Sequence, residues 1–177
     1  MNAELQTVCD RFQQELAGLE AEAAQLHPGK DPERWNMQQI MEHLLLTYQS
    51  TSEGLRRRLE KGTATRVSAT WPQRVAKTTV LRFRYLPFGR KSPESVAPKS
   101  GSPCLSGEEL SVRMRNELAA MDALLCQCEQ QLGRSPLQPH FAFGPLTAAQ
   151  WRRFHAIHAA HHLKQIRRLR RELATAA

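Results

Sequence analysis

Four of the seven histidines in this chain fall within residues 155–162, in a strongly helical segment. At about 100° per residue, His155, His158 and His162 project from one side of such a helix. The same side carries the apolar residues Trp151, Ile166, Leu169 and Leu173. The opposite side carries the basic residues Arg153, Lys164, Arg167 and Arg171. Buried imidazole nitrogens are costly without partners, and one bound metal ion satisfies several of them at once.

The spacing of His158 and His162 allows two rings on adjacent helical turns to hold one ion. A third ligand has to come from another segment, and His43 is the candidate, because it shares a helical face with Ile40 and Leu44. A lone His43 would be typical of a core histidine with a hydrogen-bond partner. Together the two histidine features indicate a metal site formed by His43, His158 and His162, with a pH-sensing core as the alternative.

Three neutral imidazoles leave the charge of a divalent ion uncompensated and one coordination position open. Such a site attracts anions, lowers the pKa of bound water, or holds a thiol as thiolate. No glutamate lies between His158 and His162, so this is not a zincin motif. We predict His155 or His161 as the acid/base residue, with a loop residue or the substrate itself as the alternatives. His161 is alternatively a partly solvated side chain. Nitrogen ligands suit zinc or nickel, with iron as a third candidate.

Gln165 follows His162 by one helical turn. We predict that it orients a ligand or contributes to cofactor binding. The alternative is that its amide only caps polar surface.

Helical periodicity and capping signals predict the elements that position these side chains. The expected helices cover residues 3–26, 37–61, 107–132 and 148–173, the last three opened by Asn36, Ser106 and Thr147. Residues 63–105 are rich in proline and contain short β-favouring patches such as 78–81. We therefore predict one all-α domain over residues 1–177, a four-helix bundle with a long crossover between its second and third helices. A crossover of this length could also carry a lid or substrate-binding loop.

The net charge of +8 indicates attraction to anions. Between Lys61 and Glu94 the chain has basic residues interleaved with aromatics and no acidic residue. This stretch could grip single-stranded nucleic acid, or form a lid in which Phe83, Tyr85 and Phe88 shape a pocket. In the lid interpretation, Arg82, Arg84 and Tyr85 contact an anionic cofactor or small-molecule substrate. We favour a partly packed, solvated crossover over both, and we expect no nucleic-acid partner.

No apolar run reaches the length of a membrane span, and the first residues lack a signal-peptide core. The four cysteines show neither disulfide-scaffold nor CxxC spacing. These observations predict a cytoplasmic protein with reduced thiols and no membrane partner.

Three motifs together resemble the DinB/YfiT superfamily, in particular a branch of unknown function. They are Trp35-x4-Ile40-x2-His43-Leu44, His140-Phe-Ala-Phe143-Gly144-Pro-Leu-Thr147 with Trp151, and His158-x2-His161-His162-Leu-x-Gln165. The resemblance covers nearly the whole chain, and Phe141 is a departure, since that branch usually has proline there. It implies a four-helix bundle in which His43, His158 and His162 hold a divalent metal.

Characterised members of the superfamily include metal-dependent transferases and isomerases that use low-molecular-weight thiols such as bacillithiol or mycothiol. The resemblance therefore implies a thiol S-transferase in which the metal activates the thiol, and it also admits a homodimer. Two alternatives stay open: a metal-dependent hydrolase that uses metal-bound water, and a non-catalytic metal- or nucleic-acid-binding stress protein.

Overall fold

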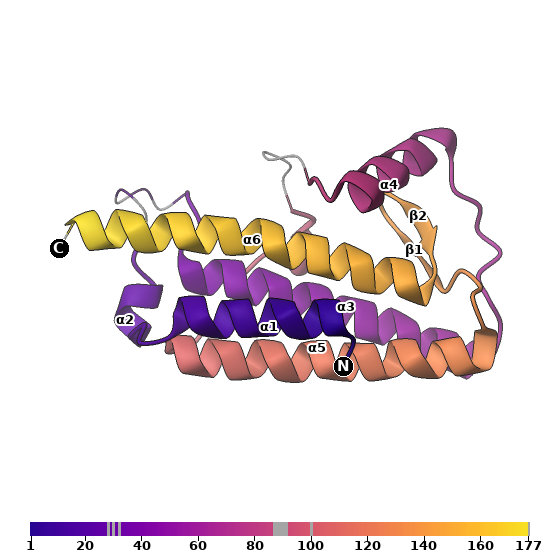
Figure 1. The fold of residues 1–177 in the computed structure, drawn as a ribbon, viewed down its shortest axis with the longest axis horizontal. Coiled ribbons are helices and arrows are strands. Elements are labelled where there is room, and N and C mark those ends of the chain that lie inside the picture. The colour runs from indigo at the N-terminus through magenta and orange to yellow at the C-terminus, as the bar shows by residue number, and fades with distance from the viewer. Residues whose placement is uncertain (28, 30, 32, 87–91, 100, 177) are drawn as a thin grey trace.

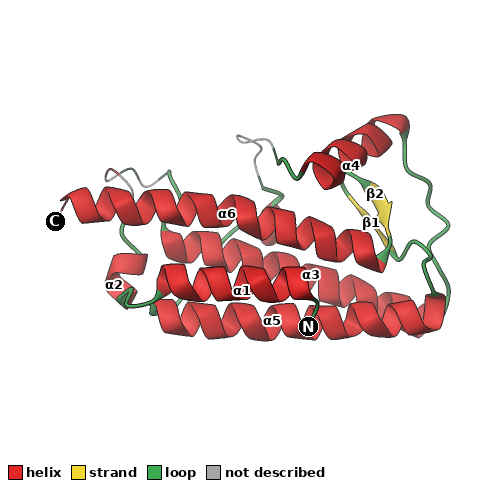
Figure 2. Cartoon of the chain, viewed as in Figure 1, coloured by secondary structure: helices red, strands yellow, loops and turns green. Residues whose placement is uncertain are grey.

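The protein is mostly helical in a computed structural model that describes residues 1–27, 29, 31, 33–86, 92–99 and 101–176 (Figures 1 and 2). Its helices are α1 (Ala3–Leu16), α2 (Ala21–Ala24), α3 (Met37–Lys61), α4 (Trp71–Phe83), α5 (Gly107–Leu132) and α6 (Ala148–Ala176), with a short 3₁₀ turn η2 (Glu94–Val96). Its strands are β1 (Gln138–His140) and β2 (Gly144–Leu146), which pair antiparallel. The helical content agrees with the all-α class, whereas the small hairpin was not predicted.

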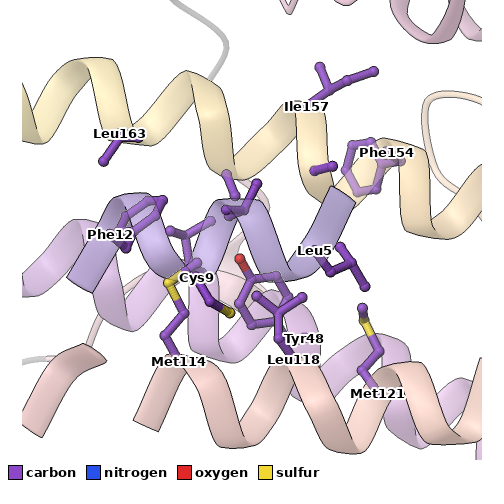
Figure 3. Packing of buried hydrophobic residues seen from close by; sticks show 14 of the residues in the cluster. Leu5, Cys9, Phe12, Tyr48, Met114, Leu118, Met121, Phe154, Ile157 and Leu163 are labelled. Carbon is purple, nitrogen blue, oxygen red and sulfur yellow. The ribbon is translucent and has the colours of Figure 1, made fainter. Parts of the chain in front are cut away.

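The helices α1, α3, α5 and α6 lie along one another around a common apolar core (Figure 1). Helix α1 contacts α5 and α6, and α3 contacts the same two helices. Figure 3 shows side chains from all four meeting in the core, among them Phe12, Tyr48, Leu118 and Leu163. This packing brings the predicted histidine faces of α3 and α6 to the interior.

Capping boxes begin α3, α5 and α6 where the sequence predicts them. Asn36 and Gln39 exchange backbone–side-chain hydrogen bonds at the start of α3, and Ser106 does the same with Glu109 at the start of α5. The Thr147 hydroxyl accepts from the amide of Gln150, whose side chain accepts from the Thr147 amide. These predicted starts are confirmed because a capping box satisfies otherwise unpaired amides at a defined residue.

The prediction of one continuous helix over residues 3–26 is wrong. Helix α1 ends at Leu16, and Gly18 adopts a left-handed conformation with φ +65°. The Gly18 amide donates to the carboxylate of Glu108 at 2.9 Å, and the Gly107 amide donates to the Leu19 carbonyl at 2.8 Å. The chain therefore turns at a glycine, where positive φ costs little, to pack against the first turn of α5.

The β-favouring interpretation of residues 78–81 is also wrong, because they lie inside α4. Thr70 and Gln73 form a capping box ahead of a proline in the first turn. Val80 and Leu81 are buried, and the Arg153 guanidinium donates to the Leu81 carbonyl at 2.6 Å. A strong helix start and burial of one helical face here outweigh the local β propensity of the threonines and valine.

Among the described helices, none is both long and apolar enough to cross a membrane.

A buried arginine ties the start of α6 to α5. Arg152 forms ion pairs with Asp122 and Glu129, and the same Asp122 carboxylate accepts from the Asn2 amide at 2.7 Å. Asp122 is buried, whereas the side chain of Glu129 is partly exposed. Because a buried guanidinium needs a charged partner, Asp122 fixes the position of α6 relative to α5.

We expect Asp122→Ala to lower the free energy of unfolding by about 3–5 kcal/mol, since it leaves Arg152 buried without its enclosed partner. The matched Glu129→Ala variant should lose about 1 kcal/mol or less, because water screens that pair. Urea unfolding followed by circular dichroism measures both. Equal losses in the two variants would show that Asp122 has no special role.

Candidate metal centre

His43 from α3 and His158 and His162 from α6 meet in the interior. The Nε2 atom of His158 lies 3.2 Å from that of His43 and 3.0 Å from that of His162. All three residues are buried, with exposed fractions of 5%, 8% and 7% respectively. One ring nitrogen of each lies within 4.8 Å of the others, which is close enough to hold one metal ion. The predicted gathering of these three residues is confirmed.

The nitrogen–nitrogen separations suit a shared ion. Zinc–imidazole bonds of about 2.0–2.1 Å at angles between octahedral and tetrahedral place two ligand nitrogens about 2.9–3.4 Å apart. The two Nε2 separations of 3.0 and 3.2 Å lie within that interval. These two pairs already have the spacing of zinc ligands, and the third pair, His43 and His162, lies within 4.8 Å.

Hydrogen bonds on the outer side of two rings define which nitrogen carries the proton. The Nδ1 atom of His43 lies 2.8 Å from the Val96 carbonyl, which can only accept. The Nδ1 atom of His162 lies 2.7 Å from Oε1 of Gln165, also an acceptor. In a neutral imidazole the other nitrogen then carries a lone pair. Both rings consequently aim the lone pair of Nε2 at His158, in the arrangement that metal-binding histidines use.

His158 cannot satisfy these neighbours by hydrogen bonding alone. A proton on its Nε2 can point to only one of two facing lone pairs, and its buried Nδ1 has no hydrogen-bond partner within the described part of the chain. With the proton on Nδ1 instead, three lone pairs face one another. A cation at their centre removes this conflict, so the residues fit a divalent ion.

Burial keeps the three imidazoles neutral. Desolvation lowers the pKa of His162 to about 3 and that of His158 well below its usual value, and the neighbouring histidines add to both shifts. Desolvation also lowers the pKa of His43, although its bond to Val96 opposes the shift. Neutral imidazole is the form that binds metal, so no proton has to be displaced at neutral pH.

Aromatic side chains hold two of the rings in place. The ring of Phe154 stacks on His158 with centroids 5.4 Å apart and planes 10° apart. The ring of Trp35 lies 5.3 Å from that of His43. These contacts restrict the imidazoles to rotamers that point toward one another.

Gln165 connects the metal centre to the crossover. Its Oε1 accepts from His162, and its Nε2 lies 3.4 Å from Nε2 of His161. His161 in turn hydrogen-bonds to the backbone of Leu86, just after α4. Because Gln165 contacts His162 directly, the ligand that it is predicted to orient would be His162 itself. His161 lies beside the centre, and its acid/base role stays a prediction.

The crossover supplies two contacts that sequence reasoning missed. The Val96 carbonyl accepts from His43, and the Ser92 hydroxyl lies 3.3 Å from the same Nδ1 atom. A backbone carbonyl has no signature in the sequence. The sequence signal nearby is Pro93, which precedes the short 3₁₀ turn seen in the structure.

His155 lies apart from the three-histidine cluster. It is fully buried, and its Nε2 lies 3.1 Å from the hydroxyl of Thr51, which itself donates to the Thr47 carbonyl. His155 therefore donates to Thr51, and burial lowers its pKa to about 3. Its ring packs against Tyr48 and Trp151. These contacts connect α3 with α6, and a catalytic role for His155 stays a prediction.

The predicted cofactor-binding residues of the crossover lie on the surface. Arg82, Arg84 and Tyr85 are exposed, and Arg84 pairs with Glu4 of α1 at 2.9 Å. Phe83 is also exposed, and Phe88 lies outside the described residues. A role for Arg82, Arg84 and Tyr85 in cofactor binding stays a prediction.

Residues 5–169 match the model of a family described as protein of unknown function (DUF1569). No curated protein and no solved structure matches the chain.

We expect purified protein to contain about one divalent ion per chain, and His43→Ala and His162→Ala each to lose it, because two imidazoles bind more weakly than three. His161→Ala removes a neighbouring imidazole that is not a predicted ligand and should keep its metal. Elemental analysis of untagged protein, with circular dichroism to confirm folding, gives the answer. Full metal content in folded His162→Ala would refute the ligand assignment.

Substitutions of Gln165 test the outer hydrogen bond. We expect Gln165→Leu to weaken zinc binding about 10- to 100-fold, since His162 loses its acceptor. Gln165→Glu should keep or strengthen binding, because a carboxylate is a better acceptor of the Nδ1 proton. Competition with a fluorescent chelator measures both affinities. Equal affinity in the two variants would mean that this bond does not tune His162.

Proposed function

The chain belongs to the DUF1569 family, and we propose that it is a metal-dependent thiol S-transferase built on a DinB/YfiT-like four-helix bundle. One observation carries the proposal: three buried imidazoles from α3 and α6 bring their ring nitrogens within 4.8 Å of one another, with two Nε2 separations of 3.0 and 3.2 Å. The resemblance of the histidine motifs to that superfamily supports the choice of reaction.

The charge of the ligand set favours an anionic fourth ligand. When bound, a zinc or nickel ion, or iron as a third candidate, supplies Lewis-acid charge that lowers the pKa of a thiol and holds it as thiolate. His43, His158 and His162 are neutral and leave that charge uncompensated. A small thiol is therefore well matched to the centre.

The composition of the cluster favours a thiol over water as the nucleophile. Within the described residues, the metal-binding cluster contains histidines and no Asp or Glu. The pKa of a free thiol is about 8.5, far below that of free water, so a thiol ionises with less help from a general base. The hydrolase alternative would need such a base beside the three histidines.

The proposed reaction transfers the thiol sulfur to an electrophilic small molecule. The thiol proton leaves to solvent, and the sulfur electron pair forms a bond to the electrophilic carbon. The leaving group departs with the electrons of the bond that breaks. His43, His158 and His162 hold the reacting centre in a fixed place, and the rings of Trp35 and Phe154 restrict their movement.

Cobalt-loaded protein offers a test that does not require the natural substrate. We expect addition of a low-molecular-weight thiol to produce a sulfur-to-cobalt band in the near-ultraviolet, and the metal-loaded protein to consume thiol in the presence of an aryl halide. His162→Ala should show neither. His161→Ala serves as the matched control for the cobalt band.

A centre that binds metal but shows no band at saturating thiol would contradict the S-transferase. Metal-dependent cleavage of an activated ester under the same conditions would favour the hydrolase instead.

A further inference from the structure

A second feature of the molecule is separate from the metal centre. Residues 62–86, which comprise α4 and its flanking segments and are called the arm below, lie outside the main helices beside the β1–β2 hairpin (Figure 1). Among the described residues, nine large hydrophobic side chains are exposed, and five of them belong to the arm. They are Val67, Trp71, Val75, Phe83 and Tyr85, and a sixth, Phe141, lies in the hairpin turn. Exposed apolar side chains are therefore concentrated in one part of the surface.

Helix α4 has two apolar faces, and only one of them is covered. Val80 and Leu81 are buried and face the rest of the protein. Trp71 and Val75 are one turn apart, so they share a different face, and Trp71 is 76% exposed. Arg74 lies beside this second face, Arg82 lies on it two turns beyond Val75, and both are exposed. The outward side of α4 is consequently an apolar strip bordered by positive charge.

The charge of the arm identifies the kind of partner. Residues 62–86 contain Arg66, Arg74, Lys77, Arg82 and Arg84 and no acidic residue. Glu4 of α1 pairs with Arg84, and the other four basic side chains have no acidic partner among the described residues. A partner that buries this surface has to provide negative charge around an apolar interior.

An anionic bilayer has this chemistry, because an interfacial helix inserts Trp and aliphatic side chains while its basic residues contact lipid headgroups. A second copy of the chain would bring two positive arms together. Single-stranded nucleic acid binds by stacking bases on successive aromatic rings along a groove. On the exposed face of α4, Trp71 is followed by aliphatic Val75, which offers no such stacking.

We propose that the arm is a docking surface for anionic membranes, with Trp71 and Val75 entering the headgroup layer and Arg74 and Arg82 contacting lipid phosphates. The contact is peripheral, consistent with the lack of a helix among the described residues that could cross a bilayer. The proposal is independent of the metal chemistry.

Vesicle binding of the full chain tests this surface. We expect the protein to sediment with vesicles of phosphatidylglycerol and phosphatidylcholine, and much less with phosphatidylcholine alone, with binding weakened by salt. Trp71 is the exposed tryptophan, since Trp151 is buried and Trp35 half-buried. Tryptophan emission should therefore shift to the blue on binding, and Trp71→Phe should remove most of the shift.

Paired variants separate the arm from general surface effects. Arg74→Gln/Arg82→Gln should weaken binding about 25-fold, from roughly fivefold for each basic residue. The control Arg56→Gln/Arg113→Gln removes the same charge from α3 and α5 and should have little effect. Trp71→Ser/Val75→Ser should weaken binding, whereas Val112→Ser on α5 should not.

The proposal would be overturned if the protein did not bind anionic vesicles at low salt, or if the arm and control variants lost equal binding affinity. It would also be overturned if the shift of Trp71 emission came from self-association, which light scattering without vesicles detects. Tighter binding to single-stranded DNA than to vesicles, lost in Trp71→Ser/Val75→Ser, would also overturn it. In each case metal content should be unchanged, so the failure is distinct from failure of the metal centre.

Discussion

The structure depends on three imidazole lone pairs that meet in an apolar interior. Outer hydrogen bonds to Val96 and Gln165 already use the Nδ1 protons of His43 and His162. Their Nε2 atoms therefore have only His158 to face, and His158 cannot satisfy both. Unpaired buried nitrogens are costly, and a divalent ion bound there would convert that cost into binding energy. The helices and the crossover are arranged so that these nitrogens converge.

Contacts between segments that are far apart in sequence hold the candidate metal centre together. The apolar core keeps α3 beside α6, and the Asp122–Arg152 pair fixes the start of α6 against α5. The crossover returns to the site at two points, at Leu86 through His161 and at Val96 through His43. The arm is thus joined at one end to the turn of α6 that carries the ligands. Membrane docking and metal chemistry would then occur on connected elements.

The sequence was sufficient to predict that His43, His158 and His162 gather, and to predict most of the long helices that carry them. The i, i+4 spacing of His158 and His162 and the apolar face around His43 are local patterns, as are the capping boxes at Asn36, Ser106 and Thr147. The break at Gly18 was missed because it depends on a bond to Glu108, ninety residues away. Helix α4 was missed because its threonines and valine favour strands. Burial of Val80 and Leu81 on one face of the helix outweighs that preference. The hydrogen bond from His43 to the Val96 carbonyl could not be predicted, because every residue has a backbone carbonyl.

X-ray absorption spectroscopy of the zinc-loaded protein tests the central claim most directly, because it reports the atoms bound to the ion without any assumption about activity. We expect nitrogen or oxygen neighbours at about 2.0–2.1 Å, with outer-shell scattering from three imidazoles. A sulfur neighbour at about 2.3 Å in protein free of added thiol would place the ion on a cysteine instead. That result, or scattering from fewer than three imidazoles, would contradict the assignment of His43, His158 and His162.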